Sequence, residues 1–171
     1  PNAINLSRGQ AGYFPPIEIY EEAKRLVNPE DKTLFRYEKV AGSVPLRKSI
    51  AKWYKEQFNL EVSYEQIAIT VGGTGGIILA INALTNPGDQ IIIPDPAYPF
   101  YTLFAKYGIS NRDVKQVPIG KGKLTRNLLE PALENNTKLV ILTSPNNPNG
   151  VVYDEQTLKD LVALAEEKDF F

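Results

Sequence analysis

A glycine-rich run at residues 72–76, with the sequence GGTGG, is the first segment in which residue type and spacing point to chemistry. Residues 67–71 before it form an apolar run typical of a buried strand, and residues 77–84 after it have a helical pattern. Glycines let the backbone turn sharply and direct several N–H groups at one point, where the start of a helix adds partial positive charge. Taken alone, the run predicts a phosphate site and a plain strand-to-helix turn equally well.

Two widely used phosphate-binding motifs do not fit this run. The dinucleotide fingerprint, counted from Gly73, requires a third glycine at position 78, where the sequence has Ile78. The Gly-Lys-Ser/Thr ending of a nucleotide-binding P-loop is missing as well. A nucleotide-binding α/β domain is therefore the weakest of the interpretations.

A second candidate segment, PDPAYPFY at residues 94–101, follows directly after the apolar run at 91–93. Three prolines stiffen it, and it presents aromatic side chains at the end of a strand, where α/β proteins bind ligands. A rigid tyrosine there can stack on a planar cofactor. For this segment alone, a structural turn whose aromatic side chains cap the core is the favoured interpretation.

The third candidate segment, SPNNPNG at residues 144–150, follows the strongly apolar run at 139–142. Two X-Pro bonds and three asparagines within seven residues are more than a turn needs. The amide of an asparagine held there can donate a hydrogen bond to a ligand oxygen. A generic Asn/Pro/Gly loop is the alternative, and its place at the end of a buried strand makes that alternative less favoured than usual.

The composition excludes several other kinds of site within these 171 residues. The sequence has no His and no Cys, so it cannot by itself form a Ser-His-Asp triad, a His metal site, a disulfide or a zinc thiolate site. Lys and Arg number 19 against 20 Asp and Glu, which offers no basic field for nucleic acid or for a membrane surface. A cytoplasmic protein is expected.

Apolar runs alternate with helical patterns along most of the chain. Strands are expected at 67–71, 91–93, 113–118 and 139–142. Helices are expected at 17–27, 45–58, 77–84, 99–107, 128–134 and from an N-cap at Asp154 onward. Continuous apolar strands separated by helices predict an α/β fold with a mostly parallel sheet flanked by helices.

Taken together and in this order, the three segments resemble the amino-terminal part of the pyridoxal-phosphate-dependent aminotransferases of class I/II, the aspartate aminotransferase type of fold type I. Two earlier segments belong to the same resemblance, NLSRG at 5–9 and YEKVAG at 37–42, the latter followed by Leu46-Arg47. The resemblance implies an arm or small-domain segment over residues 1–33 and part of the large cofactor-binding domain over 34–171.

The resemblance also implies which residues hold pyridoxal 5'-phosphate. Gly73, Thr74 and Gly75 are expected to donate to its phosphate, with backbone N–H groups and the Thr74 hydroxyl. Tyr98 is expected to stack on the pyridine ring. Asn147 is expected to donate to the phenolic oxygen of the ring and to help hold the substrate carboxylate.

Further expectations concern the substrate and a second subunit. Gly9 is expected beside the substrate carboxylate, and Tyr37 is expected to reach the cofactor phosphate of the other subunit. The latter implies a homodimer with shared active sites. Asp95–Pro96 and Asn147–Pro148 are candidate cis peptides, because prolines can aim a loop at a ligand.

The sequence departs from the family pattern in ways that limit the prediction. The lysine that binds the cofactor covalently, the aspartate facing the pyridine nitrogen and the arginine for the substrate α-carboxylate come later in the family's chains, so no catalytic residue and no metal site is assigned here. Gly72 stands where some members have a hydroxyl residue, and Asn149 stands where Thr is more usual.

The resulting prediction is an enzyme that transfers an amino group between an amino acid and a 2-oxo acid, with neither nucleic acid nor membrane as a partner. These 171 residues alone are expected to be inactive. Two alternatives remain open: a lyase or decarboxylase of the same fold, which shares these segments, and a non-catalytic truncated module that acts by association.

Overall fold

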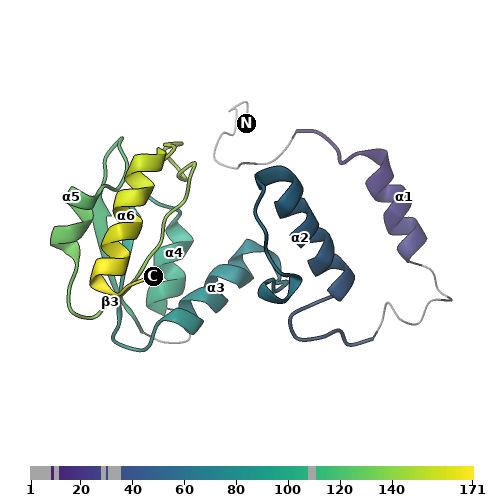
Figure 1. Ribbon diagram of the computed structural model, residues 1–171, viewed down its shortest axis with the longest axis horizontal. Helices are drawn as coiled ribbons and strands as arrows, with labels where there is room; N and C mark the ends of the chain where they lie inside the picture. The colour runs from purple at the N-terminus through teal and green to yellow at the C-terminus, as the bar shows by residue number, and fades with distance from the viewer. Residues whose placement is uncertain (1–8, 10–11, 28–29, 31–35, 108–110) are drawn as a thin grey trace, which may run out of the picture. The chain divides into compact units, whose positions relative to one another are not determined.

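The computed structural model describes residues 9, 12–27, 30, 36–107 and 111–171 (Figure 1). The chain divides into two compact units, Pro1–Ala68 and Ile69–Phe171. This division falls later than the predicted limit of the arm at residue 33, and the assignment of residues 1–33 to an arm or small domain stays a prediction.

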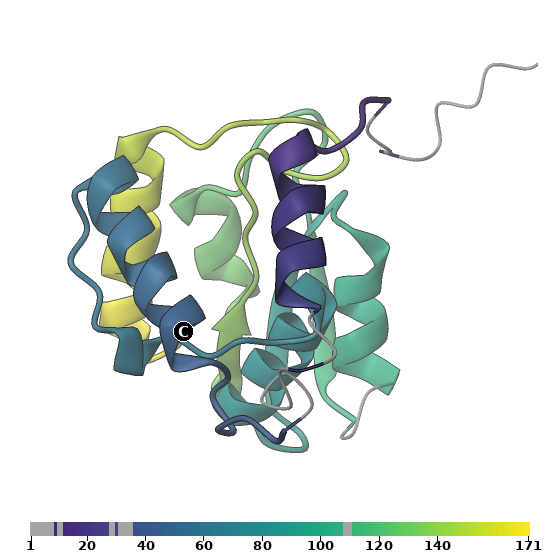
Figure 2. The same cartoon turned by 90° about the vertical axis from the view of Figure 1, so that its right-hand side faces the viewer.

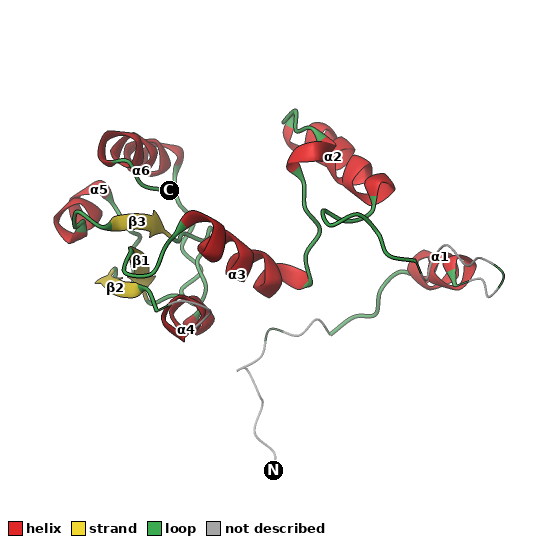
Figure 3. Cartoon of the chain, turned by 90° about the horizontal axis from the view of Figure 1, so that it is seen from below, coloured by secondary structure: helices red, strands yellow, loops and turns green. Residues whose placement is uncertain are grey.

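The unit Ile69–Phe171 is built on a sheet of three parallel strands. These are β1 (Gln90–Asp95), β2 (Asp113–Pro118) and β3 (Thr137–Val140), in the spatial order β2-β1-β3 (Figure 3). The isoleucines of β1 are fully buried because helices cover both faces of the sheet, as continuous apolar strands require. The predicted α/β fold is confirmed.

One face of the sheet is covered by α3 (Gly72–Leu84) and α4 (Pro99–Tyr107). Ile91 and Ile93 point to this face, because alternate residues of a strand point in opposite directions. They form a core cluster whose other buried members come from both helices and from β3: Ile81, Tyr101, Ala105 and Leu139.

The other face is covered by α5 (Arg126–Leu129), a short 3-10 helix η3 (Glu130–Ala132) and α6 (Glu155–Lys168) (Figures 2 and 3). Ile92 points to this side, into a second cluster that includes Leu161 and Leu164 of α6. The sheet is therefore enclosed by two helical layers.

The start of α6 follows the prediction. Asp154 is the N-cap, and its carboxylate accepts a hydrogen bond from the Thr157 N–H at 2.8 Å. The Lys123 ammonium pairs with the same carboxylate, and together with the two Thr157 hydrogen bonds it lowers the pKa of Asp154 well below its usual range. The N-cap thus joins α6 to the segment before α5.

Two predicted elements differ from the structure at the glycine run. Residues 67–70 are not a strand, because no strand of the described sheet runs beside them to complete a ladder. The helix expected at 77–84 begins five residues earlier, at Gly72, so the glycines form its first turns rather than a loop before it. In addition, β3 ends at Val140, two residues before the predicted end.

The unit Pro1–Ala68 contains α1 (Ile17–Leu26), α2 (Val44–Phe58) and a 3-10 turn η2 (Tyr64–Gln66). The buried Arg47 ties α2 to η2: its Nε donates to the Tyr64 carbonyl at 3.1 Å, and its guanidinium lies 5.3 Å from the centre of the Tyr64 ring. No residue of α1 is buried. Within the described parts of the chain, no helix has the length and apolar character needed to span a membrane.

Candidate functional site

The glycine run begins α3 with a sharp change of direction. Gly72 has a positive φ of 65°, a conformation that a residue with a side chain rarely adopts. The Thr70 hydroxyl donates to the Gly72 carbonyl at 2.9 Å, and the Gly72 N–H donates to the Thr70 carbonyl at 2.9 Å. These contacts fix the direction in which the helix starts.

The first turn of α3 leaves N–H groups available for a ligand. The first four N–H groups of a helix lack partners inside the helix, and the positive end of the helix dipole lies there. The Gly75 N–H has an acceptor, the Val71 carbonyl, at 3.4 Å. Among the described residues, the N–H groups of Gly73 and Thr74 have no acceptor, and both residues are exposed. The turn therefore offers two free N–H groups and one hydroxyl to an anion.

The structure gives different physical reasons for a glycine at different positions of this run. Gly72 is required by its positive φ, and a Cβ on Gly76 would lie 3.3 Å from the Thr70 hydroxyl oxygen. A Cβ on Gly73 would meet nothing within 4 Å, and its φ is not positive. Packing thus accounts for Gly76, whereas neither packing nor a positive φ requires a glycine at position 73.

Tyr98 lies just after β1 and is half-buried. Its ring contacts Tyr101 edge-on, with 5.4 Å between ring centres, and Phe100 at 5.2 Å. Together with Ile77, from the second turn of α3, it packs against the core cluster that contains Ile91 and Ile93. The Tyr98 ring and the glycine-rich start of α3 consequently lie on the same side of the sheet.

Asn147 lies in the loop after β3, and its side chain is exposed to solvent. The neighbouring Asn146 is only 4% exposed. Its Nδ2 donates to the Pro96 carbonyl at 3.1 Å and to Oδ1 of Asn149 at 2.9 Å, and its Oδ1 accepts from the Thr143 hydroxyl at 3.0 Å. Asn146 therefore ties the loop that carries Asn147 to the loop that leads into Tyr98.

The loop after β3 is closed on itself by further hydrogen bonds. The Asn146 N–H donates to the Val151 carbonyl at 2.8 Å, and the Val151 N–H donates to Oδ1 of Asn149 at 3.1 Å. Nδ2 of Asn149 donates to the Gly122 carbonyl at 3.3 Å. Both predicted cis peptides, Asp95–Pro96 and Asn147–Pro148, are confirmed, and Ser144–Pro145 is a third.

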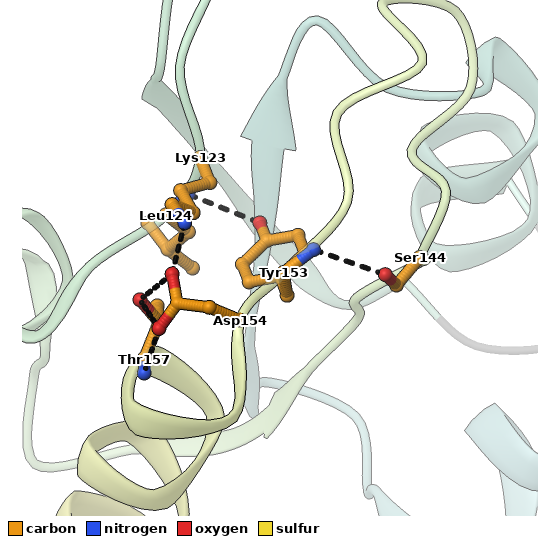
Figure 4. A network of polar contacts seen from close by, with 6 residues as sticks. All are labelled: Lys123, Leu124, Ser144, Tyr153, Asp154 and Thr157. Carbon is orange, nitrogen blue, oxygen red and sulfur yellow. Dashed lines mark hydrogen bonds and ion pairs between the residues drawn. The ribbon is translucent and has the colours of Figure 1, made fainter.

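The base of this loop is anchored in the core (Figure 4). The Tyr153 N–H donates to the Ser144 hydroxyl oxygen at 3.1 Å, and the Tyr153 hydroxyl accepts from the Leu124 N–H at 3.0 Å. Burial raises the pKa of Tyr153 above its usual value. Both ends of the segment that presents Asn147 are thus attached to fixed structure.

The remaining predicted site residues, Gly9 and Tyr37, belong to the unit Pro1–Ala68. Both are exposed, and a Cβ on Gly9 would meet nothing within 4 Å. Their roles stay predictions. The described part of the chain contains no group of three or more His, Cys, Asp or Glu side chains arranged to hold a metal ion.

Asn146 is the residue that interpretation of the sequence missed. The sequence offers three asparagines in one loop, and residue type alone does not separate the buried connector from the exposed donor. Asn146 follows Pro145 and Asn147 precedes Pro148, so each asparagine is next to one proline and the sequence does not show which of the two side chains is buried.

The family model described as aminotransferase class I and II matches residues 1–171. The probable aspartate aminotransferase of Methanocaldococcus jannaschii is 34% identical over 169 residues, which are 97% of this chain and 43% of that protein. The probable N-acetyl-LL-diaminopimelate aminotransferase of Bacillus subtilis is 33% identical over 172 residues, which are 99% and 43%. The chain thus spans less than half the length of the curated relatives that it matches.

Solved structures of aminotransferases are similar to this chain as well. The aspartate aminotransferase of Thermotoga maritima superposes with a TM-score of 0.88 at 31% identity, covering 98% of this chain and 44% of that chain. The aromatic aminotransferase of Pyrococcus horikoshii superposes with a TM-score of 0.87 at 25% identity, covering 97% and 44%.

Proposed function

Because this chain belongs to the class I and II aminotransferase family, we propose that it forms part of an enzyme that transfers an amino group between an amino acid and a 2-oxo acid. The observation that carries the proposal is the family match across all 171 residues. Relatives that carry aspartate, N-acetyl-LL-diaminopimelate and other aminotransferase names match to similar extents, so the proposal stays at the level of the amino-acid class.

We propose pyridoxal 5'-phosphate as the cofactor, and the donor groups fit it. The free N–H groups of Gly73 and Thr74, with the Thr74 hydroxyl, suit a phosphate at a helix start. The half-buried ring of Tyr98 offers an aromatic face, and the exposed amide of Asn147 offers a donor to a phenolic oxygen. The Gly75 N–H contributes less than expected, because it already faces the Val71 carbonyl.

When bound, pyridoxal phosphate supplies an electron sink for the bonds at the amino acid's α-carbon. The residues of this chain bind and orient it. Thr74 and Gly73 anchor the phosphate, Tyr98 supports the ring, and Asn147 holds the ring oxygen and the substrate carboxylate. Because Asn146 connects the two loops, the ring support and the amide donor are positioned together.

The parts of the proposal that involve the unit Pro1–Ala68 rest on the resemblance. Gly9 lies beside the substrate carboxylate, and Tyr37 reaches the phosphate site of a second subunit in a homodimer. The full exposure of Tyr37 supports this role, since its ring and hydroxyl are available to a partner. A cytoplasmic location, where amino acids and 2-oxo acids are both present, belongs to the same proposal.

The test joins residues 1–171 to the carboxyl-terminal part of the Thermotoga maritima aspartate aminotransferase that this chain does not match. The chimera is expected to bind pyridoxal phosphate, to turn yellow, and to transfer an amino group from aspartate to 2-oxoglutarate. Thr74→Ala and Asn147→Ala are each expected to raise the Kd for the cofactor about tenfold or more, because each removes a hydrogen bond to a charged group.

Asn127→Ala is the matched control, since Asn127 is an exposed asparagine in α5, on the opposite face of the sheet from Tyr98. Its Kd is expected to stay within twofold of the unsubstituted chimera. A folded chimera that stays colourless would contradict the cofactor proposal. A coloured chimera that releases carbon dioxide or eliminates a side chain instead of transferring the amino group would favour the lyase or decarboxylase alternative.

A further inference from the structure

One side chain of the loop after β3 reaches a segment that follows a different strand. Nδ2 of Asn149 donates to the Gly122 carbonyl at 3.3 Å, and Gly122 lies in the connection that follows β2. Because β1 lies between β2 and β3 in the described sheet, this hydrogen bond joins the connections of its two outer strands across the carboxyl end of β1. Asn149 therefore ties the loop that carries Asn147 to a second loop.

The turn that receives this hydrogen bond is held at both ends by the core. Ile119 before it and Leu124 after it are buried, and both belong to the core cluster on the α5 and α6 side of the sheet. The Gly122 N–H donates to the Ile119 carbonyl at 2.8 Å, which closes the turn. The Leu124 N–H donates to the hydroxyl of the buried Tyr153 at 3.0 Å (Figure 4). The Gly122 carbonyl is therefore a fixed anchor for the Asn149 amide.

The oxygen of the same amide faces back into its own loop. Oδ1 of Asn149 accepts from Nδ2 of Asn146 at 2.9 Å and from the Val151 N–H at 3.1 Å. An amide oxygen has two lone pairs, and here each of them has a donor. Asn147 consequently lies in a short stretch whose two flanking asparagines, Asn146 and Asn149, are bonded to each other.

The stretch that carries Asn147 is attached in this way to the connections after the other two strands of the described sheet. Asn146 bonds the Pro96 carbonyl, after β1, and Asn149 bonds the Gly122 carbonyl, after β2. Among the described residues, the side chain of Asn147 itself is exposed and has no hydrogen-bond partner. A free binding group whose neighbours are fixed on both sides is the arrangement of a pre-organised ligand site.

We propose that Asn149 is a positioning residue that holds the Asn147 amide in place by joining its loop to the Gly122 turn, an inference that rests on the cofactor role proposed for Asn147. The Asn149 amide has the two kinds of group that this task needs. Its oxygen accepts from Asn146 and Val151, and its nitrogen donates to Gly122. A serine hydroxyl, which ends one bond earlier, can still accept from the N–H two residues on but does not extend to the Gly122 carbonyl.

The first measurement is made on the chimera described above, without cofactor. Asn149→Ala is expected to speed hydrogen exchange of the Asn146 amide, which donates to the Val151 carbonyl at 2.8 Å, about tenfold or more. Asn136→Ala is the matched control, because Nδ2 of Asn136 also donates to a glycine carbonyl, that of Gly88, at 2.9 Å, but at the amino ends of the strands. In this control the Asn146 amide is expected to exchange within about twofold of the unsubstituted chimera.

The second measurement is a double-mutant cycle on the Kd for pyridoxal phosphate. Asn149→Ala is expected to raise this Kd about fivefold where Asn147 is present, and by less than about twofold in a chimera that already carries Asn147→Ala, because the side chain that it positions is then missing. Asn149→Ser keeps an acceptor for the Val151 N–H and is expected to match Asn149→Ala within about twofold, since both lose the bond to Gly122. Asn136→Ala is expected to leave the Kd unchanged.

Equal rises in Kd with and without Asn147 would overturn the proposal, because Asn149 would then act on the whole fold and not through Asn147. An Asn146 exchange rate that Asn149→Ala leaves unchanged would overturn it too, as would unweakened cofactor binding in Asn149→Ser. A folded chimera that binds no cofactor, or binds it equally well after Asn147→Ala, contradicts the proposed function instead. The Asn146 exchange rate then still decides whether Asn149 holds the loop.

Discussion

The two compact units differ in how many of their apolar side chains they bury. In the described residues, all the buried hydrophobic side chains belong to the unit Ile69–Phe171, on the two faces of the sheet. Among the described residues of the unit Pro1–Ala68, Arg47 is the one that is buried, and the apolar side chains of the helices are largely exposed. Both units have amphipathic helices, so helical pattern alone does not produce a core.

The difference shows what a sheet contributes. The strand β1 gives apolar helices a flat surface on each face, and Ile91, Ile92 and Ile93 become fully buried. The helix α1 has an apolar side but no buried residue, and a helix of ten residues is only marginally stable without tertiary packing. The three segments proposed to bind the cofactor all lie in the unit with the core, where loops can be held in place.

The largest expected effect comes from the same substitution made in each unit. Leu164→Ala removes a fully buried side chain of α6 and is expected to lower the free energy of unfolding by about 2–5 kcal/mol. Leu46→Ala, on α2 and 46% exposed, is expected to change it by less than about 1 kcal/mol. Urea denaturation followed by circular dichroism measures both. Equal losses in the free energy of unfolding for the two variants would contradict the difference in burial between the units.

A second pair of substitutions sharpens the contrast inside the sheet unit. Asn146→Ala is expected to lower the free energy of unfolding by about 1–3 kcal/mol, because it removes a buried side chain whose amide bonds the Pro96 carbonyl and Asn149. Asn147→Ala is expected to change stability by less than about 0.5 kcal/mol, since its side chain is exposed. Thermal denaturation of the two variants gives the comparison.

The separate effect on ligand binding distinguishes the two asparagines. In the chimera described above, Asn147→Ala should weaken cofactor binding without loss of stability. If Asn147→Ala were the more destabilising of the pair, the assignment of Asn146 as connector and Asn147 as donor would be wrong.

The smallest expected effect is on the pH dependence of stability. The pKa of Asp154 is lowered in the folded protein, chiefly by Lys123, so its contribution is present above the unfolded pKa of about 3.9 and is lost as pH falls below that value. Asp154→Asn keeps an N-cap side chain but removes the charge. The variant is expected to lose less stability than the unsubstituted chain between pH 5 and pH 2, measured as the shift of the urea midpoint.

Glu22→Gln provides the control in the other unit. The pKa of Glu22 is also lowered, by its hydrogen bond to Arg25, but the pair lies on the exposed surface of α1. In this variant, the unfolding of the unit Ile69–Phe171 should keep the same pH dependence. The circular dichroism of the β-strands, all of which lie in that unit among the described residues, follows this unfolding. A changed pH dependence would mean that the two units do not unfold as separate bodies.

The amino-acid sequence determined the class of the fold and most of its elements. The apolar run of β1, the helix at 99–107 and the N-cap at Asp154 follow from local pattern, because burial on two faces and helix capping each leave a local signature. The ordered set of three segments also pointed to the family that the comparisons confirmed.

Tertiary structure decided what depends on residues far apart in the chain. Residues 67–70 have the composition of a strand, but a strand requires a neighbour, and the described sheet provides none beside them. Asn146 and Asn147 are identical in type, and only the approach of Pro96, 50 residues away along the chain, makes one a buried connector and leaves the other free to meet a ligand. Pairing partners and burial are properties of the folded chain, because hydrogen bonds between distant segments exist only after those segments have been brought together.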